Sequence, residues 1–162
     1  MNRRVIEIYT DGSCHTQFCV GGWAAIIIID GKRTVLQGEA QNTTHNRMEL
    51  LAVIKAIEFL ESNQANAILK IYTDSQYVFR IPERMAKLKS NKFITKKGNL
   101  LQNQDLLEIL IHQIETRTIQ FIKVKAHQGT DASDISSPTN FNSEVDNLSR
   151  QIVRKAVKSS NH

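Results

Sequence analysis

The sequence of 162 residues has few of the features that mark exported or membrane-spanning proteins. Its longest apolar stretch runs only from Trp23 to Ile29, whereas a helix that crosses a bilayer needs about 20 apolar residues. The first residues, Met1 to Glu7, carry charges and lack the apolar core of a secretory signal. We therefore expect a cytoplasmic protein with no membrane segment.

Cysteine is also scarce, with only Cys14 and Cys19 in the chain. Without a signal for export, two reduced thiols are the expected state. A zinc site on this pair and His15 would need a fourth ligand, and no second Cys/His pair stands at ligand spacing. The sequence shows no repeat, linker or low-complexity tract. We expect one domain over residues 1–157 and a frayed tail over 158–162.

The net charge of +5 is modest, and it suits a polyanionic partner without requiring one. The basic excess is concentrated between residues 80 and 97, where seven basic residues face one acidic residue, Glu83. The basic residues are Arg80, Arg84, Lys87, Lys89, Lys92, Lys96 and Lys97. This segment is either a solvated face or a surface for nucleic acid.

Hydrophobic periodicity predicts a single α/β domain with a five-stranded mixed sheet. The Asp30-Gly31 pair predicts a tight hairpin turn, so the first three strands should be antiparallel. Later strands alternate with helices, which favours parallel pairing. The expected strands cover 5–10, 22–29, 33–40, 68–73 and 119–125. The expected helices cover 46–60, 75–81, 103–115 and 143–157, with 83–102 irregular or partly helical.

One tetrapeptide occurs twice, as Ile8-Tyr9-Thr10-Asp11 and as Ile71-Tyr72-Thr73-Asp74. Each copy is expected to close a strand with a carboxylate, and sites in open α/β sheets form beyond the carboxyl ends of strands. Parallel neighbouring strands lie ~4.8 Å apart, so Asp11 and Asp74 would repel each other unless a proton or a cation lies between them. The alternative is that each aspartate only forms a turn.

Glu49 and Asp146 are two further candidate carboxylates, each early in an expected helix. The alternative for both is an acidic residue favoured by the helix dipole. These two residues occur in the same chain as Asp11 and Asp74, and the presence of all four candidates favours one shared site over four separate roles. Hard oxygen ligands of this kind suit magnesium.

Five motifs in order resemble the type 1 ribonuclease H family. They are Asp11-Gly-Ser-Cys, Asn46-Arg-Met-Glu49-Leu, Asp74-Ser-Gln-Tyr, Lys125-Ala-His127 and Glu144-Val-Asp146-Asn-Leu-Ser-Arg. The resemblance runs from about Arg4 to Val153. It implies a ribonuclease H-like fold, and an enzyme that hydrolyses the RNA strand of RNA–DNA hybrids and leaves 5′-phosphate and 3′-hydroxyl ends.

The resemblance also implies the catalytic residues. The family's four metal-binding carboxylates correspond to Asp11, Glu49, Asp74 and Asp146, which would hold two Mg²⁺ ions, with Mn²⁺ as a substitute. No protein nucleophile is then needed, in agreement with the lack of a convincing Ser-His-Asp or Cys-His set. His127 matches a loop histidine that assists proton transfer or product departure, and its alternative is a solvated histidine.

Substrate contacts are implied in the same way. Contacts to 2′-hydroxyls would come from Cys14, Asn46 and Gln76, and from His45, where the family often has asparagine. Thr44 and Asn103 would hold a DNA phosphate, and Tyr77 would line the DNA channel. The alternative for Thr44 and Asn103 is that each caps a helix, and the alternative for Tyr77 is an aromatic side chain of the core. The basic segment, with Lys87, Lys89, Lys96 and Lys97, matches the family's basic protrusion.

Three other functions stay open at this point. A junction resolvase or transposase-like core would share the carboxylates but not the Asn-Arg-Met-Glu and Asp-Ser-Gln-Tyr contexts. A hybrid-binding module without cleavage is disfavoured because all four carboxylates are present. The domain could also belong to a larger polyprotein such as a reverse transcriptase, although the start at Met1 favours a stand-alone enzyme. We expect a monomer.

Overall fold

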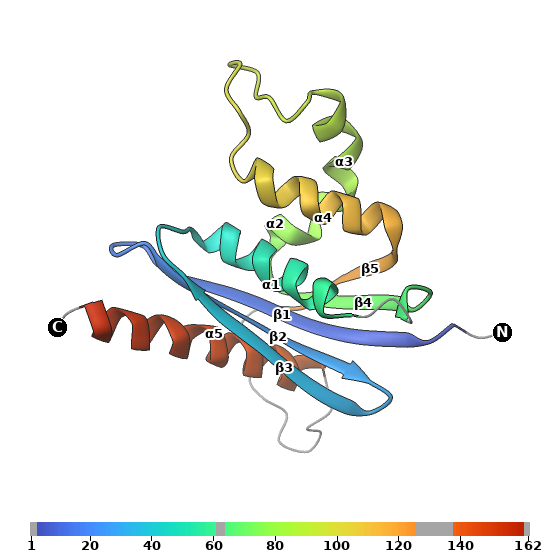
Figure 1. The fold of residues 1–162 in the computed structure, drawn as a ribbon, viewed down its shortest axis with the longest axis vertical. Coiled ribbons are helices and arrows are strands. Elements are labelled where there is room, and N and C mark those ends of the chain that lie inside the picture. The colour runs from blue at the N-terminus through green and yellow to red at the C-terminus, as the bar shows by residue number, and fades with distance from the viewer. Residues whose placement is uncertain (1–2, 61–63, 126–137, 161–162) are drawn as a thin grey trace.

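The computed structural model describes residues 3–60, 64–125 and 138–160 as one mixed sheet with helices on both faces (Figure 1). The strands of this described part lie in the order β3-β2-β1-β4-β5. Their bounds are β1 Val5–His15, β2 Val20–Ile29, β3 Lys32–Ala40, β4 Ile68–Thr73 and β5 Thr118–Lys123. β1, β2 and β3 pair antiparallel, whereas β4 pairs parallel with both β1 and β5. This confirms the mixed sheet predicted from the sequence.

The hairpin between β2 and β3 turns at Asp30 and Gly31, whose φ angles of 49° and 79° are those of a two-residue turn with both central residues left-handed. β1 is longer than expected, because β2 continues to pair with it as far as His15. Asp11 lies inside β1, where it pairs with Ala24 of β2, so the prediction that Asp11 closes its strand is wrong. The parallel pairing with β4, however, ends at Tyr9, two residues before Asp11.

The described part of the chain has five helices, of which α1 and α5 pack on opposite faces of the sheet and α3 lies away from it (Figure 1). Their bounds are α1 His45–Phe59, α2 Gln76–Phe79, α3 Ile81–Ser90, α4 Gln104–Thr116 and α5 Pro138–Ser160. Strand side chains alternate between faces, so buried Ile8 packs in the core that includes Leu50 of α1, and its neighbour Tyr9 packs with Val145 of α5. The central strands β1 and β2 are therefore buried on both faces over most of their length.

Two helices differ from the predictions. Pro82 ends the short helix α2, but it also lies in the first turn of α3, where its fixed φ favours a helix start. Residues 81–90, expected to be irregular or partly helical from 83 on, are therefore helical. α5 begins at Pro138 and reaches Ser160, so residues 158–160, expected in a frayed tail, are helical. Val153 and Ala156 are buried late in this helix and anchor its C-terminal turns.

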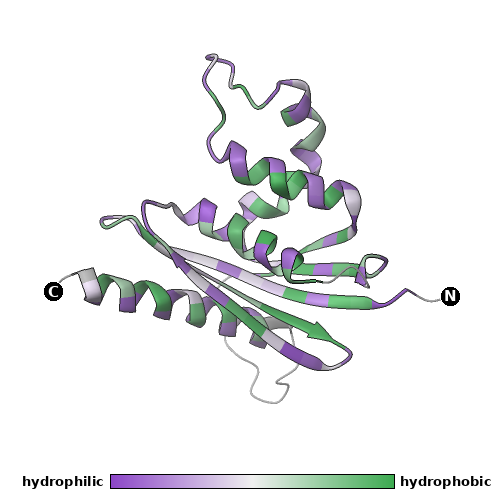
Figure 2. Cartoon of the chain, in the orientation of Figure 1, coloured by the Kyte–Doolittle hydropathy of each residue, from purple (hydrophilic) through white to green (hydrophobic). Residues whose placement is uncertain are grey.

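Hydrophilic and apolar residues alternate along α4 and α5, which gives each helix one face for the core (Figure 2). No helix among the described residues has both the length and the apolar character that crossing a membrane would require.

Candidate active site

Carboxylates from three separate elements meet at one edge of the sheet. Asp11 lies on β1, Glu49 follows one turn after the start of α1, and Asp74 comes directly after β4. One oxygen of each lies within 4.8 Å of the others. Asp11 and Glu49 are only 3% and 1% exposed. The juxtaposition of Asp11 and Asp74 predicted from the repeated tetrapeptide is thus present, because β1 and β4 are parallel neighbours.

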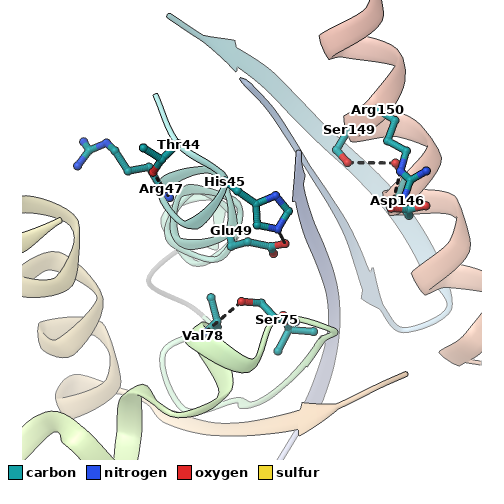
Figure 3. Close-up of polar contacts among 10 residues, drawn as sticks. Thr44, His45, Arg47, Glu49, Ser75, Val78, Asp146, Ser149 and Arg150 are labelled. Carbon is teal, nitrogen blue, oxygen red and sulfur yellow. Dashed lines mark hydrogen bonds and ion pairs between the residues drawn. The ribbon is translucent and has the colours of Figure 1, made fainter. Parts of the chain in front are cut away.

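Asp146 reaches the same place from α5, on the other face of the sheet. It lines a cavity of about 390 Å³ together with the other three carboxylates. Its Oδ1 accepts a hydrogen bond from Nε of Arg150 at 3.1 Å, one helical turn further on (Figure 3). Sequence reasoning missed Arg150, although the four-residue spacing of an acid and a base on a helix could have indicated the pair.

Gly12 allows α1 to approach β1 closely. A Cβ atom at this position would lie 2.5 Å from the backbone nitrogen of Glu49, far inside van der Waals contact. Any side chain at position 12 would therefore displace Glu49. This functional residue was also missed, and the glycine that follows Asp11 was its signal.

The electrostatics of the cluster favour a bound cation. Burial, with repulsion from Glu49 and Asp74, raises the pKa of Asp11. Burial and repulsion from Asp74 likewise raise the pKa of Glu49. Within the described residues, Oε2 of Glu49 is buried and has no hydrogen-bond partner. Carboxylate oxygens are the ligands that Mg²⁺ and Mn²⁺ prefer, so this set of residues fits such an ion.

Four of the predicted substrate-binding residues line the same cavity as the carboxylates: His45, Asn46, Gln76 and Tyr77. Cys14 lies further along β1, and its thiol donates to the carbonyl oxygen of Thr43 at 3.5 Å. Cys14 is half-buried and is not among the residues that line this cavity. The structure therefore brings the first four residues to the site and leaves Cys14 beside it.

Thr44 and Asn103 stand at the starts of α1 and α4. Thr44 caps its helix, since its Oγ1 accepts from the backbone nitrogen of Arg47 at 3.2 Å. Asn103 precedes α4 with a φ of 67° but makes no side-chain cap. Its Oδ1 instead accepts from Arg47 at 3.3 Å, and its Nδ2 donates to the hydroxyl of Tyr77 at 3.3 Å. The helix-cap alternative is confirmed for Thr44 and wrong for the side chain of Asn103.

The basic segment lies on α3 and the loop that follows it, and it projects away from the sheet (Figure 1). Lys87, Lys96 and Lys97 are exposed, whereas Lys89 forms an ion pair with Glu115 at 2.8 Å. Lys87 and Lys96 line a second cavity of about 350 Å³, separate from the carboxylates. His127 lies outside the described residues.

Known proteins of one family resemble this chain in sequence. The model of the family described as RNase H matches residues 3–154. The chain belongs to the ribonuclease H family. A ribonuclease H of Caldanaerobacter subterraneus is 33% identical over 97% of this chain and 96% of its own length. A ribonuclease H of a Wolbachia strain from Drosophila simulans is 34% identical over 94% of this chain and 98% of its own.

Solved structures support the fold. The crystal structure of LC9-RNase H1, a type 1 RNase H with the type 2 active-site motif, has a TM-score of 0.78 and 18% identity, covering 96% of this chain and 74% of that one. A foamy viral protease-reverse transcriptase in complex with dsDNA has a TM-score of 0.67 and 19% identity, covering 91% and 92%. The predicted fold is thus confirmed, and family membership makes the chain a nuclease of the ribonuclease H class.

Proposed function

We propose that this ribonuclease H cleaves the RNA strand of RNA–DNA hybrids with two divalent cations and leaves 5′-phosphate and 3′-hydroxyl ends. The observation that carries the proposal is the convergence of four carboxylates from β1, α1, α5 and the end of β4 on one cavity. Asp11, Glu49, Asp74 and Asp146 would hold Mg²⁺, with Mn²⁺ as a substitute. Such a pair of ions activates water and stabilises the leaving oxygen.

The protein contributes the position of the charges. The core fixes Asp11 and Glu49, which are buried, so the substrate meets a negative site whose geometry is set before binding. Asp74 and Asp146 are half-buried and line the cavity from the end of β4 and from α5. A phosphodiester is itself an anion and would be repelled by these carboxylates alone, which is a further reason for a cationic partner.

Recognition of RNA requires contacts to the 2′-hydroxyl, which both donates and accepts hydrogen bonds. The amides of Asn46 and Gln76 are exposed on the rim of the carboxylate cavity and have both capacities. We assign them to the RNA strand. Thr44, Asn103 and Tyr77 are assigned to the DNA strand, and the basic segment to phosphates of the duplex. Cys14, which lies beside this cavity, is also assigned to the RNA strand.

The test is incubation with four labelled duplexes: RNA–DNA, RNA–RNA, DNA–DNA, and DNA with one ribonucleotide. Cleavage confined to RNA strands paired with DNA, and dependent on Mg²⁺, is the expected result. The end groups are identified by ligation, which requires a 3′-hydroxyl and a 5′-phosphate, and by polynucleotide kinase, which labels only a 5′-hydroxyl. Equal cleavage of RNA–RNA or DNA–DNA would contradict the proposal, as would hydrolysis that persists in EDTA. The monomeric state and cytoplasmic location stay predictions.

A further inference from the structure

His45, the first residue of α1, lies directly beside one of the proposed metal ligands. Its Nε2 is 3.2 Å from Oε1 of Glu49, one helical turn further along. The imidazole side chain is 61% exposed and the carboxylate only 2%. In Figure 3 both side chains lie on the same side of α1, toward β1, while Arg47 points to the other side. The histidine thus covers the open side of a buried carboxylate.

The two oxygens of Glu49 have different surroundings. Oε1 faces His45 at hydrogen-bond distance, whereas Oε2 is buried without a hydrogen-bond partner among the described residues. A carboxylate rotates easily about its last bond, so a donor fixed on one oxygen determines where the other points. An oxygen left without a donor in a cluster of acids is the one available to a cation.

We propose that His45 is a positioning residue, which donates Nε2–H to Oε1 of Glu49 and so directs Oε2 into the cation site. The inference rests on the proposed function, since it assumes that Glu49 is a metal ligand. His45 does not belong to the group of ligand atoms within 4.8 Å of one another, which among the described residues comprises Asp11, Glu49 and Asp74. Its action is therefore through Glu49, as in other metal sites where a hydrogen-bonded partner orients a ligand.

The length of the side chain matters. Residues four apart on a helix have Cβ atoms about 5–6 Å apart, and the Nε2 of an imidazole reaches across this gap to a glutamate. An asparagine at position 45 carries its donor closer to the backbone and falls short. A glutamine has both the length and an N–H donor. His45→Gln should therefore preserve the contact, and His45→Asn and His45→Ala should abolish it.

The experiment is calorimetric titration of Mg²⁺ and of Mn²⁺ into the intact protein without nucleic acid. His45→Ala and His45→Asn should bind both cations roughly 10-fold more weakly than wild type, the lower end of the loss seen when a ligand's orienting partner is removed. His45→Gln should restore affinity. Lys55→Ala is the matched control, because Lys55 lies on the same helix in an exposed ion pair with Glu58 at 3.6 Å, and it should change neither affinity.

Three results would overturn the inference. The first is unchanged cation affinity in His45→Ala. The second is a selective loss of Mn²⁺ in His45→Gln, which would make the imidazole a direct ligand. The third is a loss of hybrid affinity in His45→Ala, measured without cations, that is restored in neither His45→Gln nor His45→Asn while all variants bind cations as the wild type does, which would make His45 a substrate contact only. If the wild type binds cations and cleaves hybrids while the variants bind cations equally well, only this inference fails. If the wild type binds neither cation, the proposed function fails with it.

Discussion

The carboxylate cavity and the basic segment would both meet the same nucleic acid, but they are built in opposite ways. The cavity is held by the register of β1 on β4 and by the packing of α1 and α5 on the sheet. The basic segment stands on α3 and an exposed loop, with lysines on its surface. Charges in the first are buried or half-buried and lie close together, and those in the second are solvated and screened by salt. We therefore expect a single change in the cavity to cost far more than one in the segment.

The largest effect should follow from Asp11→Asn. The amide keeps the size of the side chain but removes a charge that attracts the cation, so cleavage should fall below detection. Hybrid affinity should be retained, because phosphate contacts on the basic segment are untouched. Single-turnover cleavage in Mg²⁺ and hybrid binding in Ca²⁺ measure the two properties separately. Turnover near the wild-type rate would remove Asp11 from the catalytic site.

A smaller but still clear loss is expected for His127→Ala. If His127 moves a proton or helps the product leave, it assists the carboxylates and binds no metal, so turnover should fall by ~10²-fold, the lower end of general acid–base effects. Cation affinity should stay at the wild-type value. A defect confined to steady-state rates indicates product release, and one that also affects single turnover indicates proton transfer. Equal rates for variant and wild type would make His127 a solvated histidine only.

More of the carboxylate cavity than of its surroundings could be predicted from the sequence. The repeated tetrapeptide marks equivalent positions on two parallel strands, so the meeting of Asp11 and Asp74 follows from local pattern and pairing rules. The position of Asp11 within β1 did not follow, because it depends on how far β2 continues to pair. Local patterns contain no information on where a partner strand stops.

The contacts of Asn103 were beyond prediction for a similar reason. Its partners Arg47 and Tyr77 lie 56 and 26 residues away in the sequence, and only the packing of α1 with both α4 and α2 brings them together. The position of Asn103 before a helix correctly indicated a helix start but not what the amide would bind. α3 shows the same limit, since Pro82 is compatible with both the end of one helix and the start of the next.

Lysine substitutions in the basic segment test whether its solvated charges, which salt screens, bind phosphates. Lys87→Ala and Lys96→Ala should each lower the slope of log affinity against log salt by up to about 0.7–0.9 units for every phosphate that the lysine neutralises. Lys89→Ala should lower it less, because this ammonium already neutralises Glu115. Rates on saturating hybrid should be unchanged in all three. A slope that none of the variants changes would make the segment a solvated face.

The smallest expected effect concerns the ion pair that links α1, the helix that carries Glu49, to α4. Arg47 on α1 donates two hydrogen bonds to Asp105 on α4, at 2.9 and 2.8 Å. This contact lowers the pKa of Asp105 to about 2. Because the Asp105 side chain is 63% exposed, solvent screens the pair, and Asp105→Asn should cost only ~0.5–1 kcal/mol of unfolding free energy at neutral pH.

The sign of its pH dependence follows from the lowered pKa. The folded protein releases the Asp105 proton more readily than the unfolded chain does, so the stabilisation is complete above the unfolded pKa, near 3.8, and is lost as the pH falls through about 2. Urea unfolding of wild type and Asp105→Asn should therefore differ at neutral pH and converge in strong acid, with a smaller difference in high salt. A difference that persists below pH ~2 would show that Asp105 acts through packing and not through its charge. In that case the apolar core alone would hold α4 against α1.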